Sequence, residues 1–220
     1  MIPAAHIFDF DGVVVDSISM HLEAWDGAIS ATFSQVIESE LRRSLVGMST
    51  KEIAELLAQT YGNPSKRTGL ASLKRELLNE IMDNVPFLPG ALESFALLKK
   101  QGSPFGIASN APLDFINKAL SEAGITVDVV VGIENSGRPK PNPDPFLTCA
   151  KMLGIDFSNH ERCVVFEDSK HGLRAAHAAG MTPIGLETQH EAAYLKSFGA
   201  RFTCLNLQDA IDRGWMTEIK

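Results

Sequence analysis

From about residue 90 to the end of this 220-residue chain, short apolar segments alternate with stretches whose apolar residues recur at helical spacing. Strands that alternate with helices pair in parallel through right-handed crossovers. The pattern therefore predicts an α/β fold, a doubly wound parallel sheet whose functional site lies at the carboxyl ends of its strands. The expected strands lie at residues 5–8, 104–109, 127–131, 163–166 and 182–186, and the clearest helical patterns at 92–98, 115–120 and 146–153.

Residues 17 to about 86 interrupt this alternation, because several helical patterns follow one another there without a convincing strand. An all-helical stretch inserted after the first strand predicts a small second domain, with Pro86 and Pro89-Gly90 near the return to the sheet. The expected organisation is an α/β core of residues 1–16 and 87–220 and a helical domain of residues 17–86. The clearest helical face comprises Leu70, Leu73, Leu77 and Ile81.

Charge and composition exclude several function classes. The net charge of −7, with scattered lysines and arginines, disfavours nonspecific binding to nucleic acid. The chain has no run of about 18 apolar residues and no secretory signal, so we expect no membrane partner and a cytoplasmic location. Its three cysteines, which are widely spaced, predict buried thiols rather than a disulfide framework or a zinc site. A monomer is the default expectation. The cysteines are Cys149, Cys163 and Cys204.

The strongest local signal follows the first expected strand, in the run Asp9-Phe10-Asp11-Gly12. Two carboxylates two residues apart at a strand end are costly unless a divalent cation compensates them. Gly12 allows the backbone to turn sharply, and the apolar run of residues 13–15 could brace the turn. An ordinary acidic loop is the alternative for this segment taken alone.

Three later segments each follow an expected strand and supply groups that a phosphoryl-transfer site needs. Ser109-Asn110 offers a hydroxyl, an amide and a helix N-terminus for phosphate oxygens, although Ser-Asn is also a common helix cap. Lys140 stands between Pro139 and Pro141, which stiffen its backbone, whereas a lone loop lysine is usually solvated. Glu167-Asp168, followed by Ser169 and Gly172, offers metal ligands, with helix capping by Asp168 as the alternative.

In this order, the Asp-x-Asp-Gly turn, Ser109, Lys140 and Glu167-Asp168 resemble the four motifs of haloacid dehalogenase-like hydrolases. The resemblance covers nearly the whole chain. The helical insert is similar to the α-helical cap of the subfamily that includes beta-phosphoglucomutase and phosphoglycolate phosphatase. The implied fold is a Rossmann-like core with a small helical cap.

The resemblance implies a role for each matching residue. Asp9 is the nucleophile that forms an aspartyl phosphate, and Asp11 is the general acid and base. Mg²⁺ is bound by Asp9, the backbone carbonyl of Asp11 and Asp168, with Glu167 near the metal or acting through water. Phosphoryl oxygens are stabilised by two further residues, Ser109 and Lys140, with the Asn110 amide beside them.

The second acid, Asp11, favours phosphate-ester chemistry within this family. The family's dehalogenases lack that acid, and its phosphonate hydrolases carry a small residue in its place. The resemblance therefore implies a magnesium-dependent phosphatase acting on a small phosphorylated metabolite, such as a sugar phosphate or a similar monoester.

The closest alternative is a sugar phosphomutase of the beta-phosphoglucomutase type. The run from Asp16 to His21, with Ala24-Trp25, is similar to that enzyme, and His21 could orient the general acid or be a solvated helical histidine. Lys74 lies where the mutase has a substrate-contacting lysine, or is a surface lysine. Thr50, in Gly47-Met48-Ser49-Thr50, stands where the mutase would carry an arginine, which removes a bidentate phosphate clamp and favours the phosphatase.

A non-catalytic phospho-acceptor of the receiver type is a further alternative from a different class. Receiver domains also combine acids at strand ends with a hydroxyl residue and a lysine, but they are about half this length and have no helical insert. Both the insert of residues 17–86 and the second acid, Asp11, weigh against it.

Overall fold

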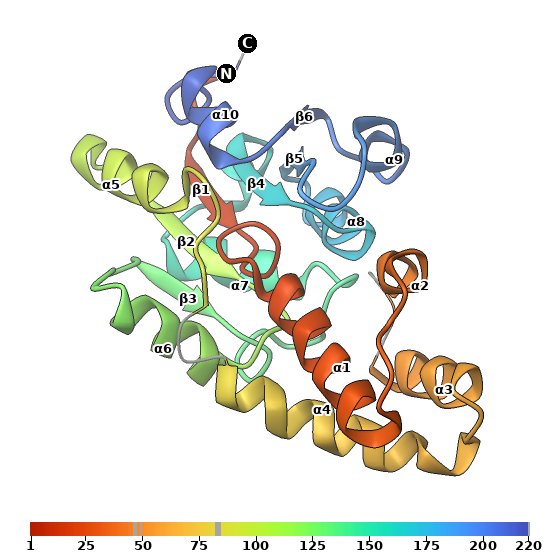
Figure 1. Ribbon diagram of the computed structural model, residues 1–220. Helices are drawn as coiled ribbons and strands as arrows, with labels where there is room; N and C mark the ends of the chain where they lie inside the picture. Colours follow the sequence, from red (N-terminus) through yellow and green to blue (C-terminus); the bar gives the residue numbers. More distant parts are fainter. Residues whose placement is uncertain (46–47, 49, 82–84, 220) are drawn as a thin grey trace. The chain divides into compact units, whose positions relative to one another are not determined.

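The computed structural model describes residues 1–45, 48, 50–81 and 85–219. The chain divides into two compact units, Met1–Asp16 with Pro86–Lys220, and Ser17–Val85. The larger unit contains the sheet and its flanking helices, and the smaller unit is helical (Figure 1). The strands of the larger unit are β1 (Ala5–Phe8), β2 (Phe105–Ala108), β3 (Val129–Val131), β4 (Cys163–Glu167), β5 (Thr182–Leu186) and β6 (Phe202–Cys204). Its helices are α5 (Ala91–Gln101), α6 (Leu113–Glu122), α7 (Asp144–Met152), η3 (Phe157–Arg162), α8 (Lys170–Ala178), α9 (Ala192–Ser197) and α10 (Leu207–Asp212).

All six strands pair in parallel in the order β3-β2-β1-β4-β5-β6. The predicted doubly wound parallel sheet is therefore confirmed. Because the chain winds outward from β1 in both directions, the switch point of the sheet lies between β1 and β4, where α/β proteins bind ligands. The edge strand β6 has no counterpart among the strands singled out above. It is three residues long and only partly buried, so it lacks the continuous apolar run that marks a central strand.

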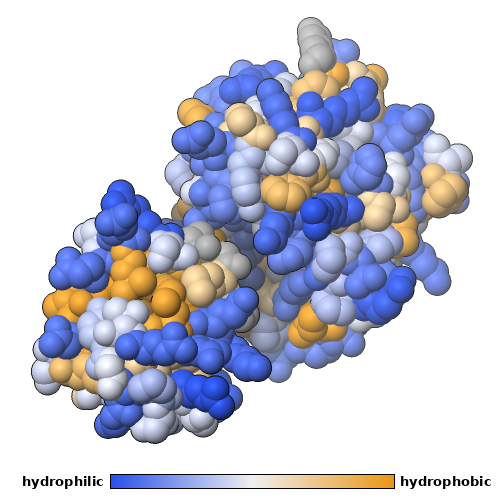
Figure 2. All heavy atoms as spheres, turned by 90° about the vertical axis from the view of Figure 1, so that its right-hand side faces the viewer, coloured by the Kyte–Doolittle hydropathy of each residue, from blue (hydrophilic) through white to orange (hydrophobic). Residues whose placement is uncertain are grey.

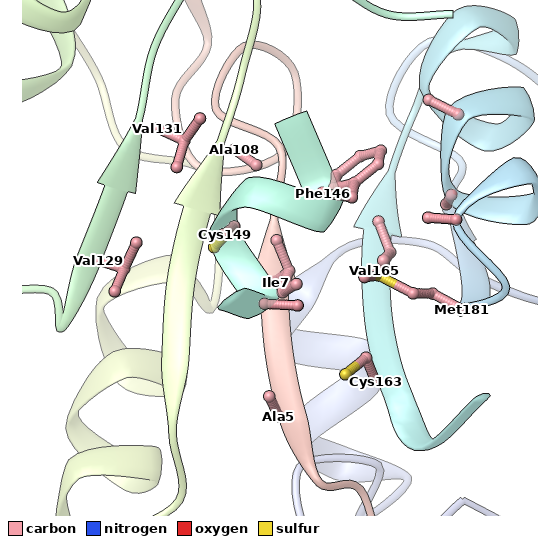
Figure 3. Close-up of a cluster of buried hydrophobic side chains, with 14 residues drawn as sticks. Ala5, Ile7, Ala108, Val129, Val131, Phe146, Cys149, Cys163, Val165 and Met181 are labelled. Atoms are coloured by element: carbon pink, nitrogen blue, oxygen red, sulfur yellow. The ribbon is translucent and has the colours of Figure 1, made fainter. Parts of the chain in front are cut away.

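Alternate residues of β1 serve the two faces of the sheet, as the two-residue period of a strand requires. Ala5 and Ile7 pack in a cluster with Phe146 and Cys149 of α7 and with Ala175 and Ala176 of α8 (Figure 3). On the other side, the Phe8 ring lies 5.2 Å from that of Phe95 in α5. Helices on both faces explain why β1 and β4 are completely buried.

The helical unit consists of α1 (Ser17–Phe33), α2 (Ser39–Ser44), α3 (Thr50–Thr60), η1 (Pro64–Lys66) and α4 (Arg67–Ile81). Its own core contains Trp25 and Ile29 of α1, Leu57 of α3 and Leu70 of α4. Leu73 and Leu77, on the helical face expected from the sequence, pack against this core while partly exposed. Apolar side chains lie among polar ones on the face that Figure 2 shows of this unit. None of the described helices is both long and apolar enough to span a membrane.

Candidate active site

Each acidic or polar motif expected from the sequence lies at the carboxyl end of a strand. Asp9 directly follows β1, Ser109 directly follows β2, and Glu167 is the last residue of β4, with Asp168 next. Lys140 precedes α7 in the connection from β3. Because β1 lies between β2 and β4, these motifs converge on one edge of the sheet at its switch point.

The Lys140 ammonium joins two of these motifs. Its Nζ donates to Asp9 Oδ1 at 2.7 Å and to Glu167 Oε1 at 2.8 Å, and it lies 4.5 Å from the centre of the Phe146 ring. Burial lowers the pKa of Lys140, but the charges of Asp9 and Glu167 outweigh burial and raise it to about 12. Lys140 is thus a buried cation at neutral pH, and the alternative of a solvated loop lysine is wrong.

Glu167 is completely buried, and both of its oxygens have partners. Oε1 accepts from Lys140, and Oε2 accepts from the backbone N–H of Ser169 at 2.9 Å and from its hydroxyl at 3.0 Å. A Cβ on Gly172 would lie 1.5 Å from Oε1, so only glycine leaves room for this carboxylate. Burial raises the pKa of Glu167, opposed by the charge of Lys140. These contacts make Glu167 an anchor for Lys140.

Asp168 lies against the turn that carries the first two acids. A Cβ on Gly12, whose φ is +78°, would lie 2.0 Å from Asp168 Oδ2. Burial, followed by the charges of Glu167 and Asp9, raises the pKa of Asp168 well above its usual value. Ser169, not Asp168, caps α8, because the Ser169 hydroxyl accepts from the Gly172 N–H at 3.1 Å. The capping alternative for Asp168 is therefore wrong.

The acidic cluster fits a divalent cation. One oxygen from each of Asp9, Glu167 and Asp168 lies within 4.8 Å of the others, and all three residues are buried. Asp11 follows on the same turn and raises the pKa of Asp168 further. Among the described residues, Lys140 forms salt bridges with Asp9 and Glu167, so one ammonium faces three buried carboxyl groups. Hard carboxylate oxygens with excess negative charge are the donors that Mg²⁺ prefers.

Ser109 and Asn110 lie at the expected edge of the sheet, but the helix after them begins later than expected. The N-cap of α6 is Pro112, because the buried Ser109 hydroxyl accepts from the Ala111 N–H at 3.2 Å instead of capping a helix. The Asn110 amide accepts from the Lys140 N–H at 2.9 Å and donates to the Lys140 carbonyl at 3.2 Å. Asn110 therefore holds the Lys140 loop, and its direct contact with phosphate stays a prediction.

Within the helical unit, Lys74 of α4 lies beside His21 of α1. The Lys74 Nζ is 3.2 Å from His21 Nδ1 and 5.9 Å from the centre of the Trp25 ring. Lys74 is buried, so the alternative of a surface lysine is wrong, and burial lowers its pKa to about 8. Among the described residues it forms no ion pair with a carboxylate. The group of His21, Trp25 and Lys74 thus holds a buried ammonium beside an imidazole and an indole ring.

Two further positions have roles that sequence reasoning did not assign. Gly172 was visible as a glycine after the acidic pair, but its contact with Glu167 needs the tertiary structure. Thr188 donates to the Gly12 carbonyl at 2.7 Å from 176 positions away, and no local pattern could indicate this bond.

Thr50 is the exposed first residue of α3, while Gly47 and Ser49 of its segment lie outside the described residues.

Comparisons with known proteins agree with this geometry. Residues 4–180 match the haloacid dehalogenase-like hydrolase family. Hexitol phosphatase B of Escherichia coli K12 is 31% identical to the chain over 188 residues, which cover 82% of each protein. Beta-phosphoglucomutase of Bacillus subtilis is 31% identical over 195 residues, covering 83% of this chain and 82% of that enzyme.

A solved structure of a family member also has a similar fold. The crystal structure of a HAD family hydrolase from Deinococcus radiodurans R1, with bound phosphate and sodium, superimposes with a TM-score of 0.81 at 28% identity. The match covers 99% of this chain and 98% of that one. The motifs converge at the switch point of the sheet, and the family match spans most of the chain. This chain therefore belongs to the haloacid dehalogenase-like hydrolases.

Proposed function

We propose that this protein is a magnesium-dependent phosphatase that hydrolyses a small phosphorylated metabolite, most simply a sugar phosphate, through an aspartyl phosphate on Asp9. The observation that carries the proposal is the buried contact of Asp9 with Lys140 at 2.7 Å, within an acidic cluster at the switch point of the sheet. This contact fixes one carboxylate oxygen of Asp9. We further propose that the protein acts as a cytoplasmic monomer.

In the first step, a carboxylate oxygen of Asp9 attacks phosphorus and the bond to the leaving alkoxide breaks. Asp11, two residues along the same turn, gives its proton to that alkoxide. Lys140 and Ser109 stabilise charge on the equatorial phosphoryl oxygens. Because Glu167 and Asn110 hold Lys140 from both sides, this cation needs little reorganisation when charge develops.

In the second step, water attacks the phosphorus of the aspartyl phosphate, and Asp11 accepts the proton of that water. The bond from phosphorus to Asp9 breaks, which releases inorganic phosphate and restores the carboxylate. Mg²⁺, held by Asp9, Asp168 and the Asp11 carbonyl, supplies positive charge that offsets the carboxylates and the phosphate. Glu167 acts on this site through Lys140, since both of its oxygens already have partners.

The helical unit bears on the choice of substrate, because it offers groups that could bind polar substituents other than the phosphate. We propose that it serves as the cap and that His21 and Lys74 contact the substrate there. The support is the buried ammonium of Lys74, which a negative or hydroxyl-rich group would satisfy. The names of two relatives, hexitol phosphatase and beta-phosphoglucomutase, support sugar phosphates as the first candidates to test.

The test is phosphate release from a panel of hexitol phosphates, sugar phosphates, phosphoglycolate and nucleotides, with and without Mg²⁺. We expect release from a hexose or hexitol phosphate that a chelator abolishes. Asp9→Asn should abolish it as well, because an amide is not a nucleophile. Asp156→Asn, the same change at an exposed acid before η3, is the matched control and should keep full activity. A wild-type protein that is folded and inactive on the whole panel would contradict the phosphatase assignment.

A mutase is the second candidate, supported by the Lys74–His21 contact and by the similarity to beta-phosphoglucomutase. A mutase must hold a bisphosphate intermediate while it turns round, and exposed Thr50 offers no guanidinium for the second phosphate. Incubation with β-glucose 1-phosphate and a trace of glucose 1,6-bisphosphate separates the two activities. Glucose 6-phosphate formed without inorganic phosphate would establish the mutase.

A further inference from the structure

Thr188 lies in the turn that follows β5, at the same edge of the sheet as the acidic cluster. Its hydroxyl donates to the Gly12 carbonyl at 2.7 Å. The turn is itself held in place, because the Glu187 N–H donates to the Cys204 carbonyl of β6 at 2.9 Å. Since β4 lies between β1 and β5, this side-chain bond joins the loops of two strands that are not neighbours.

Gly12 is constrained on three sides by this arrangement. Its N–H donates to the Val15 carbonyl at 2.8 Å, and its carbonyl accepts from Thr188. Its Cα faces Asp168 so closely that a Cβ would lie 2.0 Å from a carboxylate oxygen. The bond from Thr188 therefore restrains Gly12 at the point where the acidic turn, residues 9–12, faces Asp168.

The acidic turn needs such a restraint. Asp9 lies on it, and one Asp9 carboxylate oxygen lies within 4.8 Å of an Asp168 oxygen, with both residues buried. Like charges at short range in a protein interior repel one another, and this repulsion acts to separate the turn from β4. The Asp9 N–H, at the start of the turn, donates to the Phe166 carbonyl of β4 at 3.0 Å, and the Thr188 hydroxyl, which follows β5, holds the turn at Gly12.

We propose that Thr188 is a positioning residue, which holds the acidic turn at the distance from Asp168 that a divalent cation requires. The inference rests on the proposed magnesium-dependent function. It adds a determinant outside the four motifs, contributed by the turn that follows β5. Without the Thr188 hydroxyl, the Gly12 carbonyl loses its partner and the two sides of the cation site separate more easily.

The test compares Thr188→Val, Thr188→Ser and Thr182→Val with the wild type. Valine keeps the shape of threonine and removes the hydroxyl, whereas serine keeps the hydroxyl. Thr182→Val is a matched control at the other end of β5, because Thr182 Oγ1 donates to the Glu161 carbonyl at 2.8 Å. Mg²⁺ alone is titrated into each metal-free protein by calorimetry, and kcat and KM are measured separately at saturating Mg²⁺.

Thr188→Val should weaken Mg²⁺ binding about tenfold, which corresponds to ~1.4 kcal/mol, and should lower kcat more than it raises KM. Thr188→Ser should restore both values to within about twofold of wild type, since it restores the bond. Thr182→Val should leave Mg²⁺ affinity and kcat unchanged even where it lowers the melting temperature. A structural role alone would move the melting temperature in both valine variants without changing Mg²⁺ affinity.

The outcomes separate this inference from the proposed function. Unchanged Mg²⁺ affinity in Thr188→Val, or an equal loss in Thr182→Val, overturns the positioning role. A wild type that binds Mg²⁺ but releases no phosphate from any substrate, combined with weakened binding in Thr188→Val, supports the positioning role and refutes the phosphatase. A wild type that binds no Mg²⁺ overturns both.

Discussion

Replacement of Lys140 by methionine isolates the energetic role of the buried cation. Methionine retains the unbranched stem beside Phe146 and removes the ammonium that pairs with Asp9 and Glu167 at 2.7 and 2.8 Å. Glu167 is completely buried and cannot turn to water when its partner is lost. Removal of one member of a buried ion pair typically costs about 3–5 kcal/mol of unfolding free energy. We expect Lys140→Met to be destabilised by about that amount in metal-free buffer.

A double variant separates stability from catalysis. Adding Glu167→Gln to Lys140→Met replaces the buried carboxylate with a neutral amide, which still accepts from the Ser169 N–H. Most of the lost unfolding free energy should return, because no uncompensated charge remains on Glu167. Activity should not return, because the phosphoryl oxygens still lack their cation.

The assay is urea unfolding at pH 7.5 with chelator, followed by circular dichroism, for the wild type, both single variants and the double variant. Phosphate release is measured on the same preparations with Mg²⁺ restored. A loss below about 1 kcal/mol in Lys140→Met, the range of an exposed pair, would refute the reasoning that the buried charge needs its partner. A double variant no more stable than Lys140→Met would refute the idea that the unpaired charge of Glu167 causes the loss of stability.

Three other expectations follow from single contacts. Gly172→Ala should cost about 1–3 kcal/mol in urea unfolding and most of the activity, because its Cβ would lie 1.5 Å from Glu167 Oε1. Gly69→Ala, where nothing lies within 4 Å of the added Cβ in α4, should be neutral or stabilising. Burial lowers the pKa of His6 to about 4 from 6.5, so only the unfolded state binds that proton between these pH values. Stability should therefore fall from pH 6.5 towards pH 4 by up to about 3 kcal/mol, and this part of the slope should vanish in His6→Phe. Lys74→Met should raise KM for a sugar phosphate. Because the wild-type lysine has a pKa of about 8, it loses its charge above pH 8, so the wild-type KM should rise there. The KM of the variant should not change over the same pH range. A wild-type KM that stays flat through pH 9 would contradict a substrate contact by Lys74.

Much of the sheet was predictable because its central strands are buried on both faces. The run Cys163–Glu167 is apolar up to its last residue and could be recognised without knowing its neighbours. The expected strand at 127–131 proved shorter, Val129–Val131, since pairing with β2 begins only at Val129. The start of α6 was misplaced because Ser109 turns its hydroxyl onto a local N–H, which competes with helix capping.

The order of acids, hydroxyl and lysine along the chain was by itself enough to predict a phosphoryl-transfer site and the edge of the sheet where its residues meet. In parallel α/β folds, residues after successive strands must meet at one edge, so local sequence carries this information. The partners of each charge depended on tertiary structure. Lys140 reaches Glu167 and Asp9 across 27 and 131 positions, and Thr188 reaches Gly12 across 176. Such contacts depend on strand order and burial, and these arise only when the sheet assembles.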